Sequence, residues 1–452
     1  MLEHQTLMTI AIFSLTIFIM VWKSGKLNET VPTVIGAVLF LLMGVVPLTN
    51  LLDIFNMVSG PAITILSSIV MSIVLESIGF FNWVAYNLVN KAKGSGIRLF
   101  IYVNLLCYLM TLFFNNDGSI LITTPIIIKT VNMLNLKTKQ KIAFLLPGAI
   151  TATTSSAPIA ISNIANLIAL EIIGLDLNGY VSLMFLPSML GILTTVILLF
   201  FYFKKDIPRK LPDLRLTLRN FEKNSYSFPH PLSNREVGTN VDWPMFKICM
   251  FIIVLTRGAF FLLTPLGIPL EAIAILGALA LIAIRWYKKG TGLKDIVFRT
   301  PWHILLFAFS MYILVYGLQN IGLTSILVEE LTPLIQSDRL YAIFTMGGLL
   351  TVLSNVFNNL PAVMIGTLTL TEMGLDHHTL QVTYLANILG SDIGALLTPA
   401  GTLATLLWMF ILKAHSIQVS WSTYIKAAIV TIPFGLFVSL LSLYFWSNWV
   451  FS

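Results

Sequence analysis

Long apolar runs dominate this sequence and define its environment before any motif is considered. Of its 452 residues, 57% are hydrophobic and 10% are charged, whereas soluble domains carry about 25% charged residues. At about 1.5 Å rise per residue, a helix from each of several runs would cross roughly 30 Å of hydrocarbon: 7–22, 31–48, 61–80 and 180–203. The alternation that a membrane barrel needs is absent. The sequence therefore predicts an all-α integral membrane protein.

Several classes of protein are excluded by motifs that the sequence lacks. The first residues, 1–5, contain no Lys or Arg, so the first apolar run is expected to stay as a span rather than act as a cleaved signal peptide. Cys107 and Cys249 lie in separate apolar segments and are expected to be buried thiols without a disulfide. Neither GxxxxGK[ST] nor HExxH occurs, so the chain is predicted to be no enzyme, and we expect no cofactor. His377 and His378 alone do not indicate a resident metal site.

The placement of the basic residues predicts the topology. Lys and Arg gather after the first span, after the third span, around 137–141 and in a stretch at 205–243 that is rich in charge and proline. Because basic loops stay in the cytoplasm, 205–243 is predicted to be a cytoplasmic linker, and both termini are predicted to lie outside a plasma membrane. The loop from 322 to 338 carries three acids and is predicted to lie outside. The net charge of +7 then reflects topology and not a nucleic-acid partner.

The spans fall into two halves of opposite orientation. The first repeat is predicted at 1–204 and the second at 244–452, each with five membrane-crossing segments, so that about ten helices cross the bilayer. The segments are 6–22, 31–49, 61–80, 142–174 and 180–203, then 244–264, 267–285, 301–320, 382–414 and 422–448. Weak identity in the same order supports a duplication, as in Pro61 with Pro301 and Pro158 with Pro399. Inverted repeats of this kind place the substrate near the midplane, at the interface between the repeats.

A re-entrant hairpin is predicted in each half, at 98–135 and at 339–372, because both flanks of each stretch must lie on one side of the membrane. The tips of these hairpins would hold Asn115-Asn116 and Asn358-Asn359, and both tips read Phe-Asn-Asn. An amide without a partner in hydrocarbon costs roughly several kcal/mol. This cost favours a functional role for the two Asn pairs over simple capping of the hairpin helices.

Two of the predicted spans, 142–174 and 382–414, are too long for one straight crossing and are interrupted. The first contains Thr151-Ala152-Thr153-Thr154-Ser155-Ser156-Ala157-Pro158, and the second contains Gly394 to Thr402 with Pro399. Proline removes a backbone donor, so both helices are predicted to break there. Unwound backbone at membrane depth is tolerated where it is buried in protein or lines a wet cavity. Ser155, Ser156, Thr398 and Thr402 are the hydroxyls nearest the breaks and are predicted to line the substrate site.

Acidic residues inside apolar segments are candidates for coupling transport to protons. Asp117 follows the first Asn pair, and its counterpart in the second tip is Leu360. Because only the first tip carries an acid, Asp117 is the preferred coupling candidate. The alternative is that its carboxylate only stabilises the start of a helix through the helix dipole. Asp392 precedes the second break, and Glu76 lies in the third span. Lys129 and Arg257 are interpreted as ion-pair or snorkelling groups, and no cation is recognised at either tip.

Several motifs resemble those of one family of membrane transporters. The segment 113–125, which reads FFNNDGSILITTP, resembles the first-hairpin motif of the arsenical pump membrane protein family. The segment 385–408 is similar to that family's second broken helix, and 162–166, 310–318 and 358–361 also match. The sequence departs from the family at 151–156, where an aspartate is expected ahead of the Thr/Ser cluster. That departure leaves Asp392 without an acidic counterpart in the first broken helix.

The resemblance implies a secondary active transporter that exports arsenite and antimonite in exchange for protons, in some organisms with a soluble ATPase subunit. Arsenite near neutral pH is mainly the uncharged trihydroxide, which amides and hydroxyls can hold without thiolates. Two alternatives stay open on the same fold: a sodium/proton antiporter or organic-anion carrier, and a membrane channel subunit of an ATP-driven pump.

Overall fold

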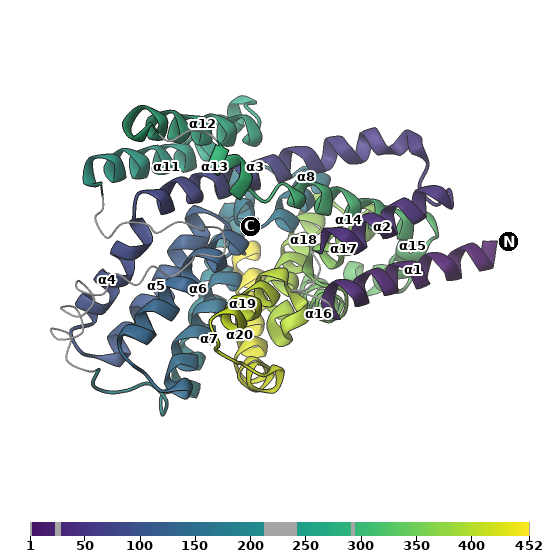
Figure 1. The fold of residues 1–452 in the computed structure, drawn as a ribbon. Coiled ribbons are helices and arrows are strands. Elements are labelled where there is room, and N and C mark those ends of the chain that lie inside the picture. The colour runs from purple at the N-terminus through teal and green to yellow at the C-terminus, as the bar shows by residue number, and fades with distance from the viewer. Residues whose placement is uncertain (1, 23–28, 212–241, 291–293, 452) are drawn as a thin grey trace.

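The computed structural model describes residues 2–22, 29–211, 242–290 and 294–451, which form helices joined by short connections (Figure 1). Ten of these helices are long and apolar enough to cross a membrane. The first half contains α1 (Leu2–Trp22), α2 (Thr30–Leu42), α3 (Leu51–Ser77), α4 (Phe80–Ala92), α5 (Gly96–Phe113), α6 (Asn116–Met133), α7 (Thr138–Thr154), α8 (Ile164–Ile173) and α9 (Leu177–Phe203). Most of the predicted linker 205–243 lies outside the described residues.

The second half repeats the order of the first. It contains α11 (Trp243–Leu263), α12 (Leu270–Lys289), α13 (Lys294–Arg299), α14 (His303–Asn320), α15 (Leu323–Ser337), α16 (Arg339–Phe357), α17 (Asn359–Glu372), α18 (His377–Asp392), α19 (Leu403–Ala414) and α20 (Trp421–Val450). The integral membrane fold is thus all-α in the described ranges, with the two helical hairpins and two broken helices that the sequence predicts. The exact bounds of the repeats, 1–204 and 244–452, stay a prediction.

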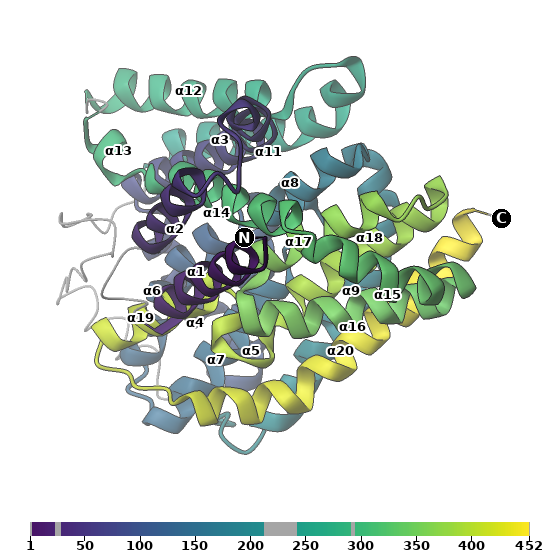
Figure 2. The same cartoon turned by 90° about the vertical axis from the view of Figure 1, so that its right-hand side faces the viewer.

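Reciprocal packing relates the two halves. Helix α2 packs on α14 while α12 packs on α3, and α6 packs on α19 while α8 packs on α17. Helices α9 and α20, which occupy equivalent positions, pack along each other. Figure 2 shows α6 beside α19 and α11 and α12 beside α3. Each half therefore completes the core of the other, and the hairpins and broken helices meet between them.

Two helices were predicted to be loops. The stretch after the third span forms α4, and the acidic stretch 322–338 forms α15. Each begins after a glycine in the left-handed conformation, Gly79 with φ of 83° and Gly322 with φ of 85°. That conformation is strained for residues with a side chain, so glycine allows the sharp turn out of α3 and α14. Both helices mix polar with apolar residues, which hides them from a search for apolar runs.

The predicted spans also differ from the structure at two ends. The span predicted at 31–49 is a helix of 13 residues that ends at Leu42, two residues before Gly44, whose φ is 68°. The span predicted to begin at residue 61 begins at Leu51, and Pro61 lies inside the helix. A proline inside a packed helix costs one hydrogen bond but does not require the helix to end.

Candidate functional site

The first hairpin turns at Phe114 and Asn115, between α5 and α6. Asn115 has an extended backbone and caps α6, because its Oδ1 accepts from the Gly118 amide at 2.9 Å. A Cβ at Gly118 would lie 2.3 Å from that Oδ1, so only glycine allows this cap. The Nδ2 of Asn115 is buried and has no hydrogen-bond partner among the described residues. The tip therefore holds one buried amide donor that the fold leaves unused.

Asn116 and Asp117 form the first turn of α6. Asn116 is 3% exposed, and its Oδ1 accepts from the Asp117 amide at 2.8 Å. The Asp117 carboxylate lies at the positive end of the α6 dipole and close enough to Glu29, at the start of α2, for repulsion between the two acids. Asp117 is half-buried.

A cation lies at the first tip, contrary to the prediction. Arg257 of α11 donates from Nε to the Phe113 carbonyl at 2.7 Å and from Nη2 to the Phe114 carbonyl at 2.8 Å. These carbonyls end α5, where the helix dipole is negative, so the guanidinium satisfies both the orphan acceptors and the dipole. Its Nη1 is buried and unpartnered in the described chain. Arg257 is therefore a capping group of the tip and not a snorkelling side chain.

The second hairpin turns at Asn358, which has a φ of 80° and precedes α17 without a side-chain hydrogen bond to its first turn. Its Nδ2 donates to the Ala400 carbonyl in the second break at 3.0 Å, while its Oδ1 is buried without a described partner. Asn359 follows as the first residue of α17 and is 6% exposed. The two tips are thus alike in position and in leaving one amide atom unused.

Asn355, one turn before this tip, fastens the second hairpin to the second broken helix. Its Nδ2 donates to the Gly394 carbonyl at 2.9 Å, and its Oδ1 accepts from the Thr398 amide at 2.7 Å. Both groups belong to the unwound segment, which consists of 3-10 turns at Gly394–Leu397 and Pro399–Gly401. On the first side Thr111 of α5 donates to the Ala152 carbonyl at 2.8 Å. Each hairpin therefore supports the broken helix of its own half.

Asp392 ends α18 at the second break, is fully buried, and lies against the first break. Its Oδ2 accepts from Ser156 Oγ at 2.8 Å and from Asn166 Nδ2 at 2.7 Å, and its Oδ1 accepts from Asn163 Nδ2 at 2.8 Å. All three donors come from the first broken helix. Asn163 also caps α8, so the positive end of that half-helix dipole faces the carboxylate.

The hydroxyls nearest the breaks have different surroundings. Ser155 donates to the Thr151 carbonyl of its own helix. Thr402 caps α19 by accepting from the Thr405 amide at 3.2 Å. Thr398 Oγ1 is buried and has no partner in the described ranges. Ser155 and Thr402 therefore have local structural contacts, whereas Thr398 offers an unused hydroxyl.

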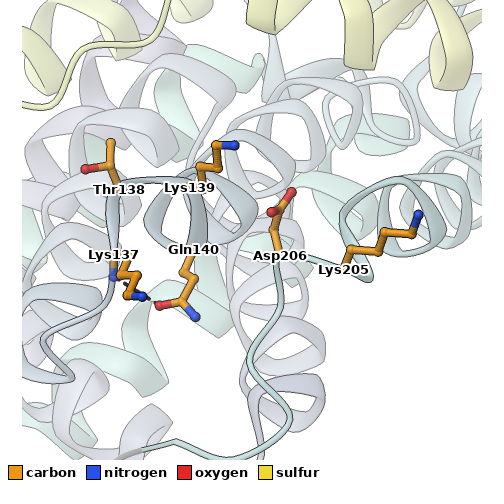
Figure 3. Close-up of a pocket in the computed structure, with 6 residues that line it drawn as sticks. All are labelled: Lys137, Thr138, Lys139, Gln140, Lys205 and Asp206. Atoms are coloured by element: carbon orange, nitrogen blue, oxygen red, sulfur yellow. Dashed lines mark hydrogen bonds between the residues drawn. The ribbon is translucent and has the colours of Figure 1, made fainter.

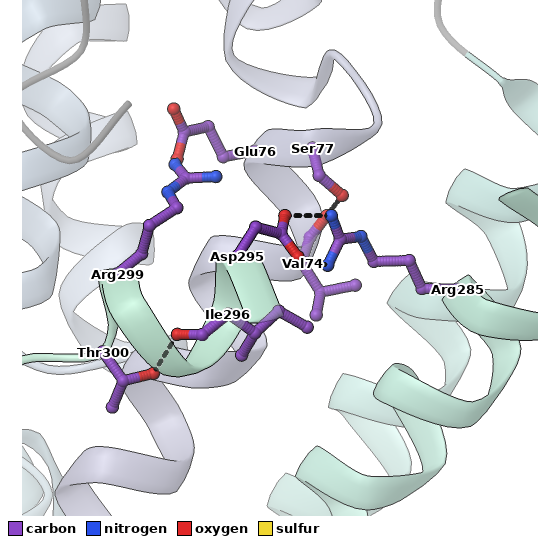
Figure 4. A network of polar contacts seen from close by, with 8 residues as sticks. All are labelled: Val74, Glu76, Ser77, Arg285, Asp295, Ile296, Arg299 and Thr300. Atoms are coloured by element: carbon purple, nitrogen blue, oxygen red, sulfur yellow. Dashed lines mark hydrogen bonds and ion pairs between the residues drawn. The ribbon is translucent and has the colours of Figure 1, made fainter. Parts of the chain in front are cut away.

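Glu76 lies in the last turn of α3 and not deep within a span. It forms an ion pair with Arg299 of α13, beside the pair of Arg285 with Asp295 (Figure 4). The short helix α13 thereby links the ends of α3 and α12. This network is separate from the tips and breaks, and the coupling role predicted for Glu76 stays a prediction.

A surface pocket of about 330 Å³ lies where the start of α7 meets the residues that follow α9 (Figure 3). It is lined by Lys137, Thr138, Lys139, Gln140, Lys205 and Asp206. None of these residues belongs to a tip or a break, so this pocket is not the candidate substrate site. Its three lysines fit the predicted basic loops on the linker side.

Comparison with known proteins decides the family. The sequence profile described as "Arsenical pump membrane protein" matches residues 8–447. The chain belongs to this family. An arsenical pump membrane protein of Escherichia coli is 34% identical over 96% of this chain and 97% of that protein. A Bacillus subtilis (strain 168) protein, provisionally named as an arsenical pump membrane protein, is 46% identical over 97% of this chain and 99% of its own length.

A solved structure supports the fold of this arsenical pump membrane protein family member. The crystal structure of the Alcanivorax borkumensis YdaH transporter, described as having an unusual topology, is similar with a TM-score of 0.54. The similarity covers 99% of both chains at 12% sequence identity. At that identity it bears on the architecture alone.

Three residues of this site were missed or misjudged as site groups in the sequence analysis. Asn163 and Asn166 lie three residues apart just after the first break, and Asn355 lies three residues before Asn358. Polar amides at helical spacing beside a predicted break or tip are the signal that would have found them. Both cysteines are buried, as predicted.

Proposed function

We propose that this protein is a secondary active transporter of the plasma membrane that exports arsenite and antimonite in exchange for protons. The observation that carries the proposal is the set of unused buried polar atoms on Asn115, Asn358 and Thr398. A buried polar atom without a partner costs about 1–3 kcal/mol, so such atoms at two tips and a break favour a bound polar ligand.

The chemistry of these atoms suits an uncharged trihydroxide. Asn115 offers a donor, Asn358 offers an acceptor, and Thr398 offers both. Each substrate hydroxyl can donate and accept, and no charge has to be balanced. Ser155, Ser156 and Thr402 still have oxygen lone pairs beyond their local contacts, and Asn116 and Asn359 complete the proposed set of substrate contacts. Such bonds are reversible, as a transporter needs.

Proton coupling is assigned to the two acids at the centre. Asp392 lies where the two broken helices meet, so its protonation state can bias their relative position. Asp117 lies at the tip with the unused Asn115 amide, so it can pass a proton between Asp392 and the predicted cytoplasmic side. Alternating access then requires a proton-bound and a substrate-bound form that open to opposite sides.

Everted membrane vesicles test this proposal. With an imposed proton gradient and no ATP, vesicles containing the protein should accumulate arsenite. Vesicles containing the Asn358→Leu variant should accumulate about tenfold less arsenite. Asn90→Ala, at an exposed position in the last turn of α4, is the matched control and should transport normally. No accumulation without ATP would instead indicate a channel subunit that works with a soluble ATPase. Accumulation that follows sodium would indicate sodium coupling.

One observation favours a second candidate, an organic-anion carrier. Arg257 supplies a cation at the first tip, and its Nη1 is unused in the described structure. The guanidinium also donates to the carbonyls of Phe113 and Phe114 and to Ser68 Oγ at 3.3 Å, and these acceptors offset much of its attraction for a carboxylate. Competition of arsenite uptake by small dicarboxylates would support this candidate, and its absence would remove it.

A further inference from the structure

If Asp392 binds and releases a proton, its surroundings must stabilise both the carboxylate and the carboxylic acid. A buried carboxylate needs donors, whereas a carboxylic acid needs an acceptor for its own proton. The three groups that contact Asp392 are all neutral donors as they stand: Ser156, Asn163 and Asn166. If all three could only donate, protonation of Asp392 would leave a buried hydrogen without an acceptor.

Other titratable groups do not solve this problem. Tyr180 of α9 and Tyr384 of α18 face Asp392, but their hydroxyls donate to the Ala157 carbonyl at 2.7 Å and the Asn166 carbonyl at 3.2 Å. The charged residues of the helices packed against α18 lie near helix ends: Glu171 on the last turn of α8, Arg339 at the start of α16, Glu372 at the end of α17 and Lys426 in the second turn of α20. Helix α3, which packs on α8, carries Asp53 in its first turn and Glu76 in its last turn.

The amides differ in their freedom to change roles. Asn163 is fixed in orientation because its Oδ1 accepts from the Ala165 amide at 3.1 Å while its Nδ2 donates to Asp392. Asn166 would have to rotate its amide by half a turn to present its buried Oδ1, which has no described partner. A hydroxyl needs only to turn about its C–O bond.

Ser156 has the geometry for that exchange. Its Oγ lies 2.8 Å from Asp392 Oδ2 and 2.7 Å from the Thr153 carbonyl, and both residues are buried. The hydroxyl has one hydrogen and can donate it to only one of these oxygens at a time. Either choice leaves its oxygen able to accept.

We propose that Ser156 is the positioning residue that lets Asp392 carry a proton, by switching its hydroxyl between Asp392 and the Thr153 carbonyl. With Asp392 ionised, Ser156 donates to Oδ2. When one proton is taken up on Oδ2, the new O–H donates to Ser156 Oγ, and the serine hydrogen turns to the Thr153 carbonyl. No other bond forms or breaks, and every member of the chain has a partner in both states.

The pairing of a buried acid with a switching serine occurs in only one of the two aligned broken helices. At the offset of about 241 that aligns Leu145 with Ala386, Asp392 corresponds to Thr151 and Ser156 corresponds to Leu397. Thr151 instead donates to Asn104 Oδ1 at 2.7 Å. The proposed switch therefore has no repeat-related copy at Thr151. This inference rests on the proposed proton exchange, but its test does not require transport.

Infrared difference spectroscopy of the purified full-length protein in lipid nanodiscs tests the switch. The carboxylic-acid C=O band of Asp392 is assigned by its loss in Asp392→Asn. In the wild type this band should lie at a hydrogen-bonded frequency. Ser156→Ala should move it to a higher frequency, because the acid O–H loses its acceptor while Oδ1 still accepts from Asn163. Ser156→Thr should restore the wild-type band.

Two further variants keep the outcomes separate. Asn166→Leu removes the competing amide, and Ser155→Ala removes a neighbouring hydroxyl that contacts only its own helix in the described structure. A band that moves in Asn166→Leu but not in Ser156→Ala would overturn the proposal in favour of a rotating amide. A band that no variant moves would overturn it as well. Failure of the proposed antiport would appear in the vesicle assay with these spectra unchanged.

Discussion

Arg257 of α11 donates to the carbonyl of Phe113 at the end of α5, with an Nε–O distance of 2.7 Å. This bond and the one to Phe114 join a helix of the second half to the first hairpin tip. The end of α5 therefore depends on a cation 144 residues away in the sequence. The contact holds the tip beside Asn115, the residue whose Nδ2 we assign to the substrate.

Replacement of Arg257 should damage the tip in a graded way. Arg257→Lys keeps the charge but loses the planar fork that reaches two carbonyls, and it should lower arsenite uptake by about tenfold. Arg257→Leu leaves both carbonyls unpaired and should lower the free energy of unfolding by about 2–4 kcal/mol. Uptake into everted vesicles and thermal unfolding measure these effects.

Arg339→Lys is the control for this series. Arg339 begins α16 and donates to Asn448 Oδ1 at 2.7 Å, away from both tips. Its replacement should leave uptake within about twofold of the wild type. Normal uptake by Arg257→Leu would contradict the assignment of Arg257 to the tip.

Asn355 should be essential to the second broken helix. Asn355→Ala removes the partners of the Thr398 amide and the Gly394 carbonyl, which lie in unwound backbone that has no helix to satisfy it. Two lost partners of this kind predict a loss of about 2–4 kcal/mol in the free energy of unfolding. Thermal unfolding in detergent should place Asn355→Ala well below the exposed control Asn90→Ala, and equal stability would show that the break does not rely on this side chain.

The sequence was sufficient to predict the parts of the fold that have local signals. Proline, glycine and hydroxyl clusters in apolar runs predicted both broken helices, and paired amides predicted both tips. The contacts between the halves have no such signal. Ser156 and Asp392 are 236 residues apart, and only the packed fold brings them together.

The elements interpreted wrongly have a common physical reason. Helices α4 and α15 have polar and apolar residues at mixed positions, so hydropathy classified them as loops. The sequence predicts that Arg257 is an ion-pair or snorkelling group, because a long cationic side chain usually pairs with an acid or reaches water. Its partners are two main-chain carbonyls and the Ser68 hydroxyl, and the carbonyls in particular are revealed by no residue type in the sequence.

The pairing of Glu76 with Arg299 predicts a role in stability rather than in coupling. Glu76→Gln should lower the free energy of unfolding by about 2–4 kcal/mol, because Arg299 is left without its carboxylate in a mostly buried position. The double variant Glu76→Gln with Arg299→Gln should recover most of that loss. Both should keep the wild-type pH dependence of uptake, and a changed pH dependence would return Glu76 to the coupling candidates.

The two central acids should differ in what their replacement removes. Asp392→Asn eliminates the proposed proton site and should abolish gradient-driven accumulation of arsenite while leaving the helices intact by circular dichroism. Asp117→Asn leaves that site in place and, as the loss of a relay, should slow the initial uptake rate by about tenfold without changing the final accumulation. Asp176→Asn, at the exposed cap of α9, is the matched control and should transport normally. Full-rate uptake by Asp117→Asn would exclude it from coupling, and gradient-driven accumulation by Asp392→Asn would exclude the buried site.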